Sequence, residues 1–99
     1  MTDLARPHSL LLSREEERNI AVAWREKGDK RARERLVLSQ LRLAEGVAKQ
    51  WWRPPLCEEE IVQEGRLGLL VAVDRFDPAR GCRLGTYATP WVRASSTRE

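Results

Sequence analysis

Apolar residues recur at helical spacing along most of the chain, and glycine or proline residues interrupt the pattern at intervals. The first such segment opens with Ser13 and Glu16, whose spacing is that of a capping box. Ile20 and Trp24 lie one turn apart on its apolar side. Gly28 can adopt the left-handed conformation that ends a helix. The pattern therefore predicts a first helix from the residue after Ser13 to the residue before Gly28.

The second segment begins at Asp29, whose side chain suits the N-cap position of a helix. Its apolar stripe and the residues that widen it are Ala32, Leu36, Leu43 and Val47, with Leu38, Leu41, Ala48 and Trp51. This spacing predicts a helix from Lys30 to about Trp52. Pro54 and Pro55 end it, because proline has no amide hydrogen and forces the residue before it toward extended geometry.

A third helix is predicted from Cys57 or Glu58 to Arg75. Three glutamates occupy its first turn, where the helix dipole favours acidic side chains. The inward stripe consists of Ile61, Gly65, Gly68, Leu69, Ala72, Val73 and Phe76. Each of the two glycines in this stripe costs about 1 kcal/mol relative to alanine. They are tolerable if another helix packs closely against them, and the alternative is that they merely weaken the helix.

A turn over residues 77–81 contains both proline and glycine and precedes the last helix. That helix can start at Thr86 or at Thr89. Pro90 favours the later start, because threonine followed by proline is a good pair of first helical positions. The later start leaves Tyr87 in the preceding loop. No segment of any length has the pattern of a strand, so the sequence predicts an all-α fold, a compact bundle of about four helices.

The length and composition of the chain indicate one globular domain. Of its 99 residues, 41% are apolar and 33% are charged. Residues 1–12 are interpreted as a flexible lead-in and residues 13–99 as one helical domain. No apolar run approaches the roughly 18 residues of a membrane span, and the N-terminus lacks the pattern of a secretory signal. These features predict a cytoplasmic protein with no membrane contact.

Few residues have the chemistry of a metal or catalytic site. Cys57 and Cys82 are far apart and His8 is the single histidine, so no zinc pattern exists and no cofactor is expected. Both thiols are expected to be reduced, although a disulfide is a formal alternative. A hydrolase that uses Cys57 or the glutamates of 58–60 is a further alternative. No nucleophile–base pair or glycine-rich phosphate loop supports it, so we expect no enzyme.

The placement of charge is more informative than the net charge of +3. From residue 80 to residue 98 the chain carries four arginines and no acidic residue. A second basic cluster lies within residues 27–42. Such clusters suit an anionic partner such as nucleic acid. The alternative is that they form solvated helix faces that only maintain solubility.

Three blocks of sequence resemble the conserved core, region 2, of bacterial sigma-70-class RNA polymerase sigma factors, closest to the heat-shock branch. Residues 60–77 read EIVQEGRLGLLVAVDRFD, which is similar to the polymerase-binding helix of that family. Residues 80–94 read RGCRLGTYATPWVRA and resemble its promoter-melting segment. Residues 36–43, LVLSQLRL, resemble the helix that opens the bundle. Linked motifs in order are far more specific than any single one.

The resemblance implies that the third helix binds a coiled coil of the largest subunit of core RNA polymerase. The residues at the contacting positions are Glu60, Gln63, Glu64, Arg66 and Leu70. Acids can pair with basic groups of the partner beside an apolar anchor. Arg66 departs from the small amide usual in the family. Without the resemblance, the glutamates are better explained as dipole-stabilising residues.

The resemblance also implies that residues 80–94 bind promoter DNA at the minus-ten element as an unpaired strand. Tyr87 matches the ring that stacks on a flipped adenine, and Trp91 matches a tryptophan at the upstream edge of the bubble. The remaining implied DNA contacts are the phosphate-binding Arg80, Arg83 and Arg93 and the hydrogen-bonding Thr86. Core packing is the alternative role for the two rings.

The chain departs from the family pattern in two ways. Cys82, Leu84 and Pro90 stand where aromatic residues are common, so weaker DNA melting is expected. The promoter-reading helix and the later domains are missing after residue 94, which suggests an artificial fragment, a short paralogue or a disrupted gene. The sequence thus predicts a sigma module that binds polymerase and minus-ten DNA. The alternative is a docking or decoy protein that binds polymerase or an anti-sigma partner without opening DNA.

Overall fold

The computed structural model of the chain describes residues 11–55 and 57–96. Within these ranges the elements are α1 (Arg14–Lys27), α2 (Lys30–Lys49), α3 (Glu58–Arg75), the 3-10 helix η3 (Pro78–Arg80) and α4 (Leu84–Ser96). The predicted all-α fold is confirmed. Most of the predicted lead-in, together with His8, lies outside the described residues.

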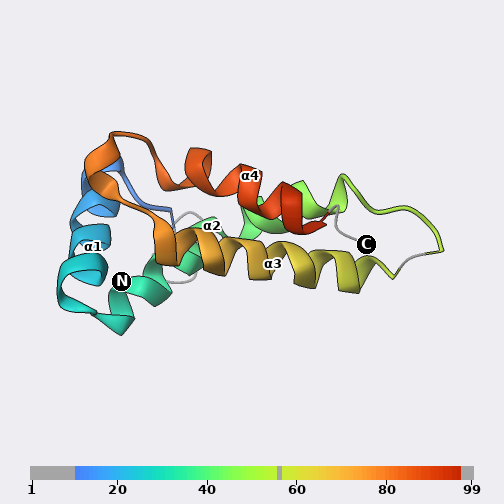
Figure 1. Cartoon of the computed structure of the whole chain (residues 1–99), viewed down its shortest axis with the longest axis horizontal. Coiled ribbons are helices and arrows are strands. Elements are labelled where there is room, and N and C mark those ends of the chain that lie inside the picture. Colours follow the sequence, from blue (N-terminus) through green and yellow to red (C-terminus); the bar gives the residue numbers. More distant parts are fainter. Residues whose placement is uncertain (1–10, 56, 97–99) are drawn as a thin grey trace, which may run out of the picture.

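The helices α2, α3 and α4 run along the length of the molecule, and α1 lies across one end (Figure 1). Helix α3 packs against both α2 and α4. The largest fully buried side chains come from these three helices: Leu36, Leu69, Val73, Leu84 and Val92. Each contributes about 1.5–3 kcal/mol through burial of its apolar surface. None of the described helices is long and apolar enough to cross a membrane.

Both ends of α1 and the start of α2 have the predicted capping geometry. The Ser13 hydroxyl accepts the Glu16 amide at 3.1 Å, and the Ser13 amide donates to the Glu16 carboxylate at 2.9 Å. The Ser13 amide and then its hydroxyl lower the pKa of Glu16. Gly28 ends α1 with φ of 64°, and Asp29 accepts the second and third amides of α2. The predicted start and end of α1 and the predicted start of α2 are therefore confirmed.

Helix α2 is shorter than predicted, and part of its predicted apolar stripe is exposed. It ends at Lys49, and residues 50–52 continue as hydrogen-bonded turns instead of reaching Trp52 as helix. The prediction that Leu38 and Leu43 belong to the buried stripe is wrong, since they are 39% and 46% exposed. Ala48 is buried as predicted, and the small side chains of Ser39 and Ala44 are buried beside it. Small residues at these positions let the backbone of α2 approach α3 closely.

The predicted close packing against the glycines of α3 is confirmed. A Cβ atom added to Gly65 would lie 2.7 Å from the Ala48 Cβ on α2. A Cβ atom added to Gly68 would lie 2.6 Å from the Trp91 carbonyl oxygen on α4. Both distances are shorter than real Cβ contacts. The two glycines therefore let α3 lie between its two neighbours at short range.

The predicted start of the last helix is wrong. Helix α4 begins at Leu84, so Tyr87 is helical and Pro90 lies inside the helix. The early start is stabilised from outside the segment, because the Leu84 amide donates to the Glu17 carboxylate of α1 at 2.7 Å. The Leu84 side chain is also fully buried. Pro90 is exposed, so the carbonyl of Thr86, which loses its usual helical donor, lies on the solvent side.

A pair of glycine substitutions tests the close packing of α3. Changing Gly68 to alanine should lower the free energy of unfolding by about 1–3 kcal/mol, because the added methyl group overlaps the α4 backbone. Gly46 is an exposed helical glycine with open space at its Cβ position. Gly46→Ala should raise the free energy by about 0.5–1 kcal/mol. Urea unfolding followed by circular dichroism measures both, and equal effects would contradict the packing.

Candidate protein and nucleic-acid interfaces

The five residues predicted to bind a protein partner lie on α3, outside its buried stripe. Glu60, Gln63 and Arg66 are exposed, and Glu64 and Leu70 are half-buried. The buried residues of α3 face α2 and α4, so the opposite side of the helix is left open to solvent. We call this open side the outer face of α3, defined by residues 60, 63, 64, 67, 70 and 71.

Arg66 lies at the edge of this face and turns toward α2. Its Nε donates to the Glu45 carboxylate at 3.0 Å. A second bridge joins the same helices, in which Arg33 donates to Asp74 at 2.7 Å and has its pKa raised by that hydrogen bond. Both pairs are partly exposed, so each is worth only about 0–1 kcal/mol. Their main effect is to hold charged groups along the α2 side of α3.

The centre of the outer face is apolar, which the sequence prediction missed. Leu67 is 50% exposed and Val71 is 39% exposed, and they lie one turn apart. Leu70 is beside them, and the acids Glu60 and Glu64 flank the group. The sequence does carry a signal for this apolar centre, because Leu67 and Val71 fall outside the buried stripe when α3 is drawn as a helical wheel. The arrangement is an apolar centre with a charged rim, which is typical of a protein-binding surface.

Three aromatic rings form a series at the junction of α3 and α4. The Tyr87 ring centroid is 5.7 Å from that of Phe76 and 6.4 Å from that of Trp91. The Arg75 guanidinium lies over the Trp91 ring at 5.2 Å. Phe76 is buried, whereas Tyr87 and Trp91 are half-buried and pack against the edge of the core. The two rings are thus fixed by packing and still present part of their surface to solvent.

The polar residues predicted to bind DNA divide into two groups. Arg80 in η3 and Thr86 and Arg93 in α4 are exposed. Arg83 is engaged within the protein, because its guanidinium donates to Glu17 at 3.2 Å and to the Leu12 carbonyl at 2.8 Å. These bonds connect the chain before α1 and α1 itself to the start of α4.

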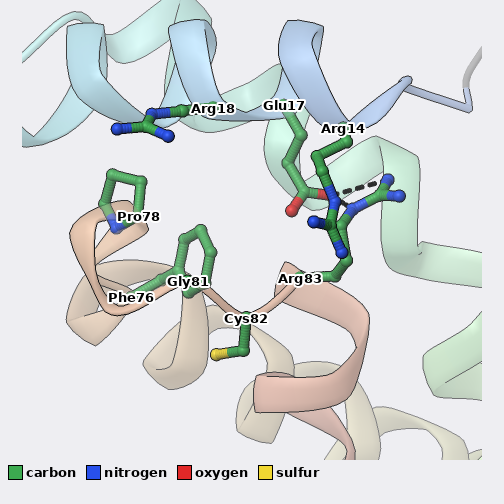
Figure 2. A pocket seen from close by; sticks show the side chains of 8 residues that line it. All are labelled: Arg14, Glu17, Arg18, Phe76, Pro78, Gly81, Cys82 and Arg83. Carbon is green, nitrogen blue, oxygen red and sulfur yellow. Dashed lines mark hydrogen bonds and ion pairs between the residues drawn. The ribbon is translucent and has the colours of Figure 1, made fainter.

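Glu17 is the acceptor at the centre of this connection, and the sequence prediction missed it. It is only 3% exposed. One carboxylate oxygen accepts from Arg83 (Figure 2), and the other accepts the Leu84 amide. A buried charge is tolerated only when it is paired and hydrogen-bonded in this way. From sequence, Glu17 is one more first-turn acid, and nothing in its neighbourhood reveals a partner 66 residues away.

A polar hollow of about 380 Å³ lies between α2 and the first turns of α4. Its wall includes the amide of Gln40 and the hydroxyls of Thr86 and Thr89, with Leu43 and Gly85 between them. Thr89 already donates to the Gly85 carbonyl at 2.8 Å. Amide and hydroxyl groups can donate to or accept from the edge of a nucleic-acid base. Apart from Thr86, the sequence prediction missed this group, because its members come from different helices.

Metal and thiol chemistry contribute little to these surfaces. Among the described residues no group of three or more histidine, cysteine, aspartate or glutamate side chains could hold a metal ion. Cys57 and Cys82 are free, exposed thiols. The two surfaces consist of charged groups, rings and apolar side chains, which are suited to binding.

Comparisons with known proteins identify the family of the chain. The family model described as Sigma-70 region 2 matches residues 36–99. The chain is 41% identical over 85 residues to the RNA polymerase sigma factor RpoH of Caulobacter vibrioides, covering 86% of this chain and 29% of that protein. It is 42% identical over 88 residues to the RNA polymerase sigma factor RpoS of Coxiella burnetii, covering 89% and 25%.

The chain therefore belongs to the sigma-70 region 2 family. The resemblance that the linked sequence motifs carry is confirmed by this match and by both relatives. The chain spans less than a third of the length of the curated relatives it matches.

The buried carboxylate of Glu17 can be tested by removing its charge. Glu17→Gln should lower the free energy of unfolding by about 1.5–3 kcal/mol, because hydrogen bonds to charged groups are of that strength. It should also speed hydrogen exchange at the Leu84 amide. Glu15 is an exposed acid in the same turn, so Glu15→Gln should change stability by less than about 0.5 kcal/mol. Equal losses in the two variants would contradict the assignment.

Proposed function

We propose that this chain is a sigma-factor module that binds core RNA polymerase through the outer face of α3. It recognises the unpaired minus-ten promoter element through α4. The observation that carries the proposal is membership of the region 2 family together with two surfaces of suitable chemistry on separate helices. Because the surfaces are on separate helices, one can be occupied while the other is in use. No residue is assigned a catalytic role.

The polymerase-binding part rests on the composition of the outer face of α3. Glu60, Gln63 and Glu64 supply acceptors near the N-terminal half of the helix. Leu67 and Leu70 supply apolar surface beside them. A coiled coil of the largest polymerase subunit that carries basic residues around apolar ones would match this face in charge and in polarity. Arg66 is paired with Glu45, which reduces its repulsion of a basic partner.

The DNA-binding part rests on the half-buried rings and the exposed basic residues of the region from η3 to α4. Tyr87 and Trp91 offer ring surface on which bases can stack, at about 1–3 kcal/mol per base. Arg80 and Arg93 are exposed and can contact phosphates. Thr86 lies beside the polar hollow, where a base edge could be hydrogen-bonded. Arg83, which is engaged by Glu17, is better suited to holding the start of α4 in place than to binding a phosphate alone.

Leu67 provides a test of the polymerase surface. Leu67→Ala should weaken binding to core RNA polymerase by about 1–2 kcal/mol, since central apolar residues contribute most of the energy of an interface. Its side chain is half exposed, so helicity should be unchanged. Leu38 on α2 is similarly exposed and serves as the matched control. Biolayer interferometry with immobilised core polymerase measures both, and equal affinities for the two variants would argue against this surface.

Tyr87 provides a test of the DNA surface. Tyr87→Ala should weaken binding to a single-stranded minus-ten oligonucleotide by about 1–3 kcal/mol through loss of stacking. Tyr87→Phe keeps the ring and should bind nearly as well as the unaltered chain. Fluorescence anisotropy is recorded together with thermal melting, because Tyr87 also packs on Phe76.

The two measurements separate recognition from packing. A lower melting temperature with unchanged affinity of the folded protein would mean that Tyr87 only packs against the core. Polymerase binding by an unaltered chain that does not bind minus-ten DNA would favour the docking-only alternative.

A further inference from the structure

A cavity of about 80 Å³ lies where α1, η3 and the start of α4 meet. Arg14 and Arg18 of α1 line it together with Arg83 (Figure 2). Pro78 and Cys82 line the side formed by the turn before α4. In Figure 2 the Arg18 side chain extends toward Pro78, while Arg14 lies near Glu17 and Arg83. The cavity is small and suits a compact ligand.

The charges around this cavity do not balance. Three arginines line it, and Glu17 is the one carboxylate among its lining residues. Both oxygens of Glu17 are already engaged, one by Arg83 and the other by the Leu84 amide. Within the described part of the chain, neither Arg14 nor Arg18 forms an ion pair. The cavity therefore keeps an excess of positive charge that a compact anion would neutralise.

We propose that this cavity binds a phosphate group toward which Arg14 and Arg18, now extended to its two ends, both turn (Figure 2), and that the phosphate belongs to the DNA strand bound by α4. Guanidinium groups bind phosphate through paired, charge-assisted hydrogen bonds. Continuity with the DNA surface supports this source. Glu17 and Arg83 line both this cavity and the polar hollow that contains Thr86. A strand that leaves the hollow past Arg83 thus reaches Arg14 and Arg18. This second part of the proposal rests on the proposed function.

The two cysteines provide a direct assay for occupancy of the cavity. Cys82 lines the cavity, whereas Cys57 precedes α3 and lies outside it. Inorganic phosphate should slow alkylation of Cys82 by iodoacetamide several-fold and leave Cys57 unchanged, with mass spectrometry as the readout. Sodium chloride at equal ionic strength is the control and should protect neither thiol. In the Arg14→Ala/Arg18→Ala double variant, protection of Cys82 by phosphate should disappear.

Binding of oligothymidylate then tests whether the phosphate belongs to DNA. This strand has a backbone but lacks the minus-ten sequence. The double variant should bind it about threefold to tenfold more weakly at low salt. The slope of log affinity against log salt should fall by about 0.7 for each phosphate that the variant no longer neutralises. Lys49→Ala removes an exposed positive charge at the C-terminal end of α2, outside both basic clusters, and should change neither quantity. Circular dichroism verifies that each variant is folded.

The outcomes separate this proposal from the proposed function. Phosphate protection of Cys82 with unchanged oligothymidylate binding would overturn the DNA source and leave free phosphate as the ligand. Absence of protection, together with unchanged binding in the double variant, would overturn the site altogether. If the unaltered chain binds no DNA at all, the proposed function fails. In that case, protection of Cys82 by inorganic phosphate would still test whether the cavity binds phosphate.

Discussion

The structure depends on a single buried carboxylate that joins the first helix to the last. Glu17 accepts the guanidinium of Arg83 and the amide of Leu84 at once. This interaction sets where α4 begins, and hence on which turns Thr86 and Tyr87 lie. Replacing such a pair with apolar groups could preserve stability. It would not preserve the amide acceptor, so the position of the candidate DNA surface relative to α1 would change.

Tight packing around α3 has a related consequence for the two surfaces. Gly65 and Gly68 let α2 and α4 approach the same helix at short range, with Ala48 and the backbone of Trp91 as neighbours. The residues that α3 does not need for this packing, Leu67 among them, are left on its outer face. One helix therefore forms the central element of the fold and also carries the candidate protein-binding surface. Packing this close resists local deformation, so the two surfaces are held in a fixed mutual geometry.

Local sequence rules predicted the parts of the fold that depend on local interactions. Ser13, Gly28 and Asp29 set helix ends through bonds within a few residues, and those ends were predicted correctly. The start of α4 was mispredicted because Pro90 is a strong local signal, whereas Glu17 acts from the other end of the chain. Leu36 and Ala48 of α2 were assigned to the core correctly, but Leu38 and Leu43 are exposed and Ala44 is buried, because the distance between helices decides which side chains fit.

The candidate site residues were found through linked motifs more than through physical patterns, and their roles remain predictions. The position of Pro90 inside α4 has a consequence for the backbone of that helix. Since proline has no amide hydrogen, the main-chain carbonyl of Thr86 lacks its usual helical donor, and both residues are exposed on α4. In the free protein water or a neighbouring donor must satisfy that oxygen. A ligand that covers this side of α4 must supply a donor to that oxygen or leave its water in place, so the backbone as well as the side chains limits what the surface can accommodate.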